Sequence, residues 1–237
     1  MSLSAFEDTG PLSADGSGAR RPVRPRDAAT LIVIDHAGDG EPRVLMGRRN
    51  SGHDFMPGKW VFPGGRIDRS DFRAPFASAL KPDVAARLEQ TAPTSRARAL
   101  ALAAIRETFE ETGLLLAKAA PARIAAGPWR EFLAFGALPD LAALDFVARA
   151  VTPAMSPKRF DARFFMASAD RLISLEPQAD CGELDEIIWV KLSAALELDL
   201  PSVTRFVLKE IPLRLIDASR PAPSLRFARG RETLVYI

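Results

Sequence analysis

The apolar positions of the chain fall into short β-branched runs, which predict strands, and longer segments with the spacing of helices. Short apolar runs bounded by turn residues are typical of buried strands. The predicted strands are residues 28–35, 43–48, 60–62, 159–167 and 183–190, with two weaker ones at 213–216 and 234–237. Gly38, Asp39 and Gly40 lie between the first two strands, so these are expected to form a hairpin.

Helical segments lie between these strands. The predicted helices are residues 84–89, 95–112, 129–148, 192–196 and 202–211. In the longest one, Ser95 is the expected N-cap, and Gly113 suits the position just after the last turn. Strands and helices do not alternate in regular βαβ units. The pattern therefore predicts an α/β (mixed α+β) fold, with a mixed sheet flanked by helices.

The composition is that of a globular protein. The chain has 237 residues, of which 47% are hydrophobic and 26% charged, and the formal net charge of +2 argues against a broad nucleic-acid-binding face. No apolar run reaches the roughly 18 residues of a membrane span. Residues 1–26 lack the apolar core of a signal peptide and are expected to be a flexible tail. With Cys181 as the single cysteine, a reducing cytoplasm is the expected location.

The segment richest in candidate chemistry is residues 106–114, which read RETFEETGL. On a helix, Glu107, Glu110 and Glu111 share one face because they are spaced i, i+3 and i+4. Three like charges repel each other, and Arg106 offsets part of that repulsion. Mg²⁺, which prefers hard oxygen ligands, would offset it better. A solvated acidic helix face is the alternative interpretation.

This segment resembles the second half of the Nudix hydrolase box, G-x5-E-x7-R-E-U-x-E-E-x-G-U, where U is a bulky apolar residue. It matches every fixed position, except that Thr108 stands at the first U. The first half begins at Gly65, after a strand end where glycine permits close backbone approach, and Asp71 stands in place of the family's Glu. Between Asp71 and Arg106 lie 34 residues where the box has seven, which predicts a 27-residue insert.

An insert at this place is similar to that of the acyl-coenzyme A diphosphatase-like branch of the Nudix family. Other segments that resemble this branch are residues 48–58, 151–153, 159–165 and 201–205. The resemblance covers roughly residues 28–211 and implies a Nudix α/β/α sandwich. It implies a single domain over residues 27–237, with residues 72–95 as the insert within the box.

The resemblance also implies roles for individual residues. The implied ligands of Mg²⁺ or Mn²⁺ are Glu107, Glu110, Glu111 and the carbonyl of Gly65. Arg106 would orient the carboxylates, and Asp71 is either part of the site or a turn cap. Glu183 and Glu186 are candidates for a further metal ligand or general base, with a solvated strand rim as the alternative. The candidates for the base are thus Glu110, Glu111, Glu183 and Glu186.

Basic residues near the first half of the box are candidates for binding phosphate groups, with solvated surface as the alternative for each. These substrate-binding candidates are Arg48, Arg49, His53 and Arg66. The resemblance implies hydrolysis of a diphosphate in a nucleoside diphosphate-linked small molecule, with coenzyme A or acyl-coenzyme A as the expected substrate. The alternatives are an ADP-ribose or nucleotide-sugar diphosphatase, and a non-catalytic Nudix module that senses a ligand or binds a partner. A homodimer is expected, with no nucleic-acid or membrane partner.

Overall fold

A mixed sheet built around one long central strand organises the fold. The computed structural model describes residues 23–36, 40–52, 56–154, 156–174, 176, 183–228 and 231–237. The strands are β1 (Arg26–Asp35), β2 (Arg43–Arg49), β3 (Trp60–Val61), β4 (Gly64–Arg66), β5 (Ala117–Ala119), β6 (Ala137–Pro139), β7 (Asp145–Val151), β8 (Phe160–Ser168), β9 (Leu184–Lys191), β10 (Pro223–Ala228) and β11 (Arg231–Tyr236). The helices are α1 (Pro82–Glu89), α2 (Thr94–Thr112), α3 (Arg130–Ala134), α4 (Leu192–Ala195) and α5 (Ser202–Ile216).

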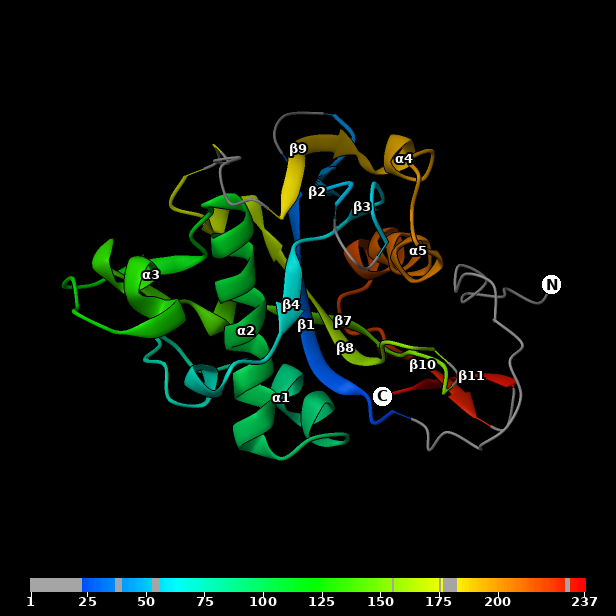
Figure 1. Cartoon of the computed structure of the whole chain (residues 1–237), viewed down its shortest axis with the longest axis horizontal. Coiled ribbons are helices and arrows are strands. Elements are labelled where there is room, and N and C mark those ends of the chain that lie inside the picture. The colour runs from blue at the N-terminus through cyan, green and yellow to red at the C-terminus, as the bar shows by residue number, and fades with distance from the viewer. Residues whose placement is uncertain are drawn as a thin grey trace.

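Nine of the described strands form the main sheet, in the order β11-β10-β7-β8-β1-β2-β3, while β4 also pairs with β1 and β9 with β2 (Figure 1). β1 is parallel to β8 and antiparallel to β2, so the predicted mixed sheet and the predicted hairpin are confirmed. β5 and β6 form a separate small sheet. Short 3-10 turns connect these elements: η1 (Arg69–Phe72), η2 (Gly127–Trp129), η3 (Leu141–Ala143) and η4 (Ala169–Arg171).

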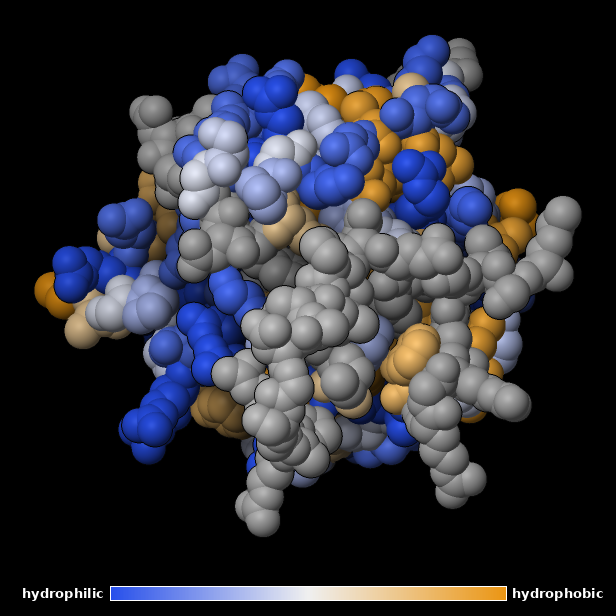
Figure 2. All heavy atoms as spheres, turned by 45° about the vertical axis from the view of Figure 1, so that its right-hand side comes forward, coloured by the Kyte–Doolittle hydropathy of each residue, from blue (hydrophilic) through white to orange (hydrophobic). Residues whose placement is uncertain are grey.

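Alternate residues of β1 face two different hydrophobic cores. Leu31 and Val33 pack in the core formed with α1 and α2, whereas Ile32 and Ile34 pack in the core formed with α4 and α5. Successive side chains of a strand point to opposite faces, so a continuous apolar run is what a strand covered on both sides requires. Figure 1 shows α2 and α3 on one side of β1 and α5 on the other, which is an α/β/α arrangement. Among the described residues visible in Figure 2, hydrophilic ones predominate and hydrophobic ones gather in separate patches.

The long helix α2 carries the glutamate stripe and ends as predicted, but it begins differently. Gly113 adopts a left-handed conformation with φ 72° and donates its N–H to the carbonyl of Phe109, which ends the helix. The prediction of Ser95 as the N-cap is wrong: the N-cap is Pro93, in an extended conformation, and no side chain caps this end. Proline has a fixed φ that suits the approach to the first turn, so the helix starts one residue earlier, at Thr94.

Two predicted elements are wrong, and the strands β4, β5 and β10 are not predicted by the sequence. The predicted helix 129–148 is instead α3, β6, η3 and β7, interrupted at Gly136, whose φ is 69°. Fully buried strands and buried helices have the same apolar content, so periodicity alone does not separate them. The predicted strand 213–216 is the end of α5, which continues through Pro212.

The predicted insert, residues 72–95, contains the end of η1, all of α1 and the start of α2. α1 buries Val84 and Leu88 in the same core as α2, so this segment packs on the helix that bears the glutamates. The predicted tail 1–26 falls almost wholly outside the described residues, and β1 already begins at Arg26. No helix in the described part of the chain is both long and apolar enough to cross a membrane.

Candidate active site

The last two turns of α2 place the three glutamates beside the glycine pair of β4. Glu111 is buried, with 4% of its surface exposed, whereas Glu107 and Glu110 are increasingly accessible. The stripe therefore runs from the protein interior toward solvent. A solvated acidic face, the alternative interpretation of the sequence, does not describe Glu111.

Gly64 connects the first half of the motif to Glu111. Its backbone N–H donates a hydrogen bond of 3.0 Å to Glu111 Oε2. The φ of Gly64 is 154°, and a Cβ at this position would lie 2.5 Å from the carbonyl oxygen of Ala29. Glycine is required here because any side chain would collide with the backbone of β1.

Gly65 lies directly against Glu107. A Cβ on Gly65 would lie 2.4 Å from Glu107 Oε2, so the absence of a side chain is what admits the carboxylate. The two halves of the motif therefore meet in space, although many residues separate them in the chain.

Arg106 is the buried centre of the carboxylate network. Its Nη1 donates to Glu107 Oε1 at 2.9 Å and to Glu110 Oε2 at 2.8 Å. Its Nε and Nη2 donate to the two oxygens of Asp71 at 2.9 and 3.0 Å, and Nη2 also reaches the carbonyl of Arg66 at 3.0 Å. Burial opposes the charge of Arg106, but the hydrogen bond to Asp71 and the neighbouring carboxylates raise its pKa above the usual value. Arg106 thus fixes two of the three glutamates.

Asp71 is completely buried and pairs with Arg106 rather than facing solvent. It also accepts hydrogen bonds from Trp129 Nε1 at 2.9 Å and from the backbone N–H of Asp68 at 2.8 Å. The second bond belongs to a capping box with Asp68 that starts η1, so Asp71 is the expected turn cap as well as the counterion of Arg106. The sequence does not indicate the role of Trp129, because its contact with Asp71 spans 58 positions and no local pattern predicts it.

Burial makes negative charge costly at the stripe. It raises the pKa of Glu107 from 4.5 to about 7, against the opposing effect of Arg106. The pKa of Glu110 is raised by burial too, and that of Glu111 is raised well above its ordinary value in spite of the hydrogen bond from Gly64. The charge of Glu183 contributes to all three shifts. A cation at this place would relieve the repulsion.

Hard carboxylate oxygens around a backbone cradle are the donors that Mg²⁺ or Mn²⁺ takes. Among the described residues, no three His, Cys, Asp or Glu side chains converge into a ready-made metal cage. Mg²⁺ usually keeps several water ligands and needs few direct protein ligands, so a looser set of carboxylates is enough. The Glu107 carboxylate seated against Gly65, together with the costly charge of the stripe, fits a divalent cation.

The two late acidic candidates lie in different surroundings. Glu183 is exposed just before β9, and its charge acts on the whole stripe. Glu186 lies within β9 and forms an ion pair of 3.2 Å with Arg48 Nη2, both side chains being about half exposed. The structure therefore brings Glu183 toward the stripe and ties Glu186 to a neighbouring strand.

The basic candidates that the structure describes have different surroundings. Arg48 lies over the ring of Trp60 at 5.8 Å, in addition to its pair with Glu186. Arg49 is near enough for its charge to act on the pKa of Glu111. The side chain of Arg66 is exposed. His53 lies outside the described residues, as does Cys181.

Thr108, which departs from the family pattern, is accommodated within the helix. It is buried, and its hydroxyl donates to the carbonyl of Ala104 at 2.8 Å. Because the helix itself satisfies the polar group, a threonine fits where the box has an apolar residue. The departure leaves the stripe intact.

The fold and the site together define an α/β/α protein whose helix-borne glutamates meet a glycine pair, and the comparisons identify its family. A crystal structure of a NUDIX hydrolase from Alicyclobacillus acidocaldarius is 30% identical, covering 78% of this chain and 90% of that one, with a TM-score of 0.60. The chain belongs to the Nudix hydrolase family. No family model matches it.

Two curated relatives are similar over parts of their length. "Putative nudix hydrolase 7" of Caenorhabditis elegans is 28% identical over 70% of this chain and 51% of that protein. "Acyl-coenzyme A diphosphatase NUDT19" of Xenopus laevis is 31% identical over 38% of this chain and 34% of that protein. The chain spans about half or less of the length of these relatives.

Proposed function

We propose that the chain hydrolyses a diphosphate linkage in a nucleoside diphosphate-linked small molecule, with Mg²⁺ or Mn²⁺ as cofactor. The observation that carries the proposal is the packing of Glu107 and Glu111 against Gly64 and Gly65, where burial makes their charge costly. A protein that only bound a neutral partner would gain nothing from such a cluster. Membership of the Nudix hydrolase family supports the same reaction.

The residues that would hold the cation are Glu107, Glu110, Glu111 and the carbonyl of Gly65. When bound there, a divalent ion would neutralise charge on the diphosphate and lower the pKa of a coordinated water. The protein's own contribution is orientation. Arg106 holds Glu107 and Glu110, and the Gly64 N–H holds Glu111.

A general base must reach the attacking water without giving up a stronger partner. Among the candidates Glu110, Glu111, Glu183 and Glu186, we assign the base to Glu183. It is exposed and close enough to act on the charge of all three stripe glutamates. Glu186 is paired with Arg48, and Glu110 is paired with Arg106.

For the substrate, we propose coenzyme A or an acyl-coenzyme A. The similarity to the Xenopus laevis acyl-coenzyme A diphosphatase supports this class. Arg48, Arg49 and Arg66, at or near the ends of the strands beside the stripe, would contact its phosphates by charge-assisted hydrogen bonds. The cytoplasmic location and the homodimer remain predictions from the sequence.

A product assay tests the reaction and the substrate together. Purified protein with Mg²⁺ is incubated with coenzyme A, 3′-dephospho-coenzyme A, ADP-ribose and NADH, and the phosphorus-containing products are separated. We expect 4′-phosphopantetheine and adenosine 3′,5′-bisphosphate from coenzyme A, and no product with EDTA. Faster cleavage of ADP-ribose than of either coenzyme A form would refute the substrate. Absence of any metal-dependent product over the panel would refute the reaction.

A further inference from the structure

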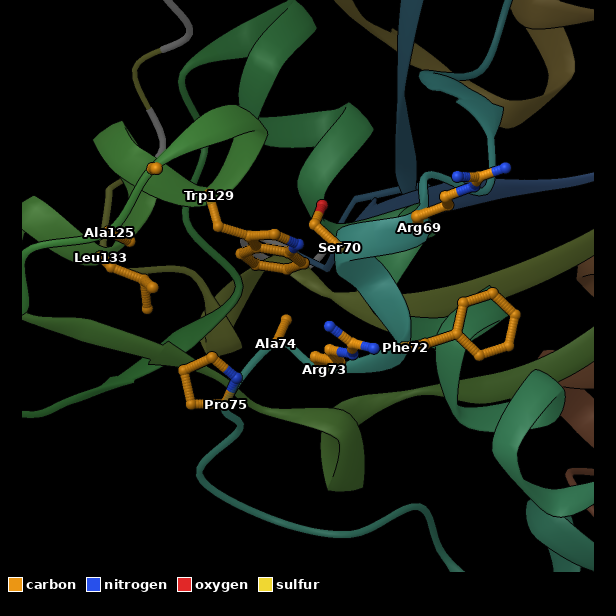
Figure 3. A pocket seen from close by; sticks show the side chains of 10 residues that line it. Arg69, Ser70, Phe72, Arg73, Ala74, Pro75, Ala125, Trp129 and Leu133 are labelled. Atoms are coloured by element: carbon orange, nitrogen blue, oxygen red, sulfur yellow. The ribbon is translucent and has the colours of Figure 1, made fainter.

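Trp129 lies outside the Nudix box, yet its side chain reaches the centre of the carboxylate network. It is 3% exposed, and its indole Nε1–H donates a hydrogen bond of 2.9 Å to Asp71 Oδ1. Figure 3, which views the pocket between η1 and α3, shows the indole nitrogen of Trp129 directed toward η1, the turn that carries Asp71. A residue from a different segment of the chain thus contacts the counterion of Arg106.

The carboxylate of Asp71 accepts two hydrogen bonds on each oxygen. Oδ1 accepts from Arg106 Nε and from Trp129 Nε1, both at 2.9 Å. Oδ2 accepts from Arg106 Nη2 at 3.0 Å and from the backbone N–H of Asp68 at 2.8 Å. Because Asp71 has no exposed surface, solvent does not replace a donor that is lost. Trp129 therefore helps to set the orientation of this carboxylate.

The guanidinium of Arg106 transmits that orientation to the glutamates because it is planar. Its Nε and Nη2 contact Asp71, while its Nη1 donates to Glu107 at 2.9 Å and to Glu110 at 2.8 Å. The N–H donors of a guanidinium form a rigid fork and cannot turn independently. A rotation of the Asp71 carboxylate therefore changes the direction of Nη1, and with it the positions of two proposed metal ligands.

The indole of Trp129 is itself held by an aromatic cluster that reaches α2. Trp129 meets Phe132 edge to face with ring centroids 5.3 Å apart, and Phe132 meets Phe109 in the same way at 5.3 Å. Phe109 lies on α2 directly before Glu110. The cluster packs α3 against the helix that bears the glutamates, so the N–H of Trp129 approaches Asp71 from a fixed direction.

We propose that Trp129 is a positioning residue of the metal site, which raises the affinity for the divalent cation through Asp71 and Arg106. The inference rests on the proposed function, because it takes the glutamate stripe as the cation site. Trp129 acts on the glutamates through two other side chains, so its loss weakens the binding of the cation without abolishing it. A purely structural hydrogen bond would stabilise the fold and leave the affinity unchanged.

Calorimetric titration of the full chain with Mn²⁺ alone measures this affinity without any turnover. W129F removes the indole N–H and keeps an aromatic ring. It should weaken Mn²⁺ binding about 3- to 10-fold, which is less than the full worth of a hydrogen bond to a charged group because only part of the change reaches the ligands. The matched control is F146L, which alters a buried ring of the same core that packs on Phe165. F146L should lower Tm and leave the Mn²⁺ affinity unchanged.

A double-mutant cycle with D71N tests whether the effect passes through Asp71. D71N keeps the shape of the side chain and loses the charge that holds Arg106. W129F should therefore change the Mn²⁺ affinity much less in the D71N background than in the wild type, whereas independent effects would give the same fold-change in both. An NMR titration of the wild type with Mg²⁺ needs no variant to fold. Because coupling between two sites is reciprocal, Mg²⁺ should shift the indole N–H resonance of Trp129.

The proposal is overturned if W129F binds Mn²⁺ as tightly as the wild type, or if F146L weakens binding to the same extent. Equal fold-changes in the cycle, or an indole resonance that does not move with Mg²⁺, would overturn it too. Any of these results with hydrolysis intact leaves the proposed function standing. Conversely, absence of hydrolysis over the substrate panel, with the affinity difference between W129F and the wild type retained, contradicts the proposed reaction alone.

Discussion

Replacing Asp71 with alanine should destabilise the fold far more than the removal of a surface carboxylate. Asp71 has no exposed surface and accepts hydrogen bonds from Arg106, from Trp129 and from the backbone of Asp68. Its removal leaves the guanidinium of Arg106, which is 3% exposed, without its bidentate partner. Breaking a buried ion pair in this way costs about 3–5 kcal/mol. In a domain of this size that corresponds to a fall in Tm of about 6–20 °C.

Urea unfolding followed by circular dichroism, at pH 7 and in EDTA, measures this loss without interference from a bound metal. The matched control is D199A, which removes a carboxylate that is 69% exposed and paired with Lys59; its cost should be below about 1 kcal/mol. D71N keeps the shape but loses the charge, so its cost should be intermediate. A loss below about 1 kcal/mol in D71A would refute the view that Asp71 anchors Arg106.

Three other outcomes follow from the site. E111Q should lower turnover by orders of magnitude while the fold stays intact. Adding EDTA to the wild type should lower turnover to a similar extent. Full activity in either experiment would contradict a metal held by the stripe. Because burial raises the pKa of Glu107 to about 7, the folded metal-free protein binds a proton that the unfolded chain releases near pH 4.5. Its unfolding free energy should therefore fall as pH rises from about 4.5 to 7, and E107Q should show a smaller fall in the same urea titrations. G65A should displace the Glu107 carboxylate and reduce kcat with little loss of stability. G64A, whose Cβ meets the backbone of β1, should instead lower Tm markedly. If the two variants had equal effects on kcat and on Tm, the different roles assigned to Gly64 and Gly65 would be contradicted.

The sequence predicts those parts of the fold and site that depend on local spacing. The strands around β1, the end of α2 at Gly113 and the glutamate stripe all follow from periodicity and from residues close in the chain. The helix predicted over residues 129–148 is wrong because alanine- and leucine-rich stretches suit a buried strand as well as a helix. The last part of this segment, β7, pairs instead with β8.

The contacts that fix the site are long-range, and sequence spacing does not reveal them. Asp71 contacts Arg106 across 35 positions and Trp129 across 58, and both partners lie on other elements. The sequence also does not show that Glu183 and Glu186 have different surroundings. That difference depends on the register of β9 against β2, which places Glu186 opposite Arg48. The placement of His53 stays a prediction, because that residue lies outside the described part.

The Asp71–Arg106 pair also makes the site tolerant of variation in chain length. The pair closes a loop of 34 intervening residues at a buried point beside the glutamates. For a flexible loop, each doubling in length adds only about 0.6 kcal/mol to the entropic cost of closure. That increment is several times smaller than the roughly 3–5 kcal/mol lost when a buried ion pair is broken. Residues can therefore be added to or removed from the connections of this segment outside α1 and α2 while the carboxylates keep their positions.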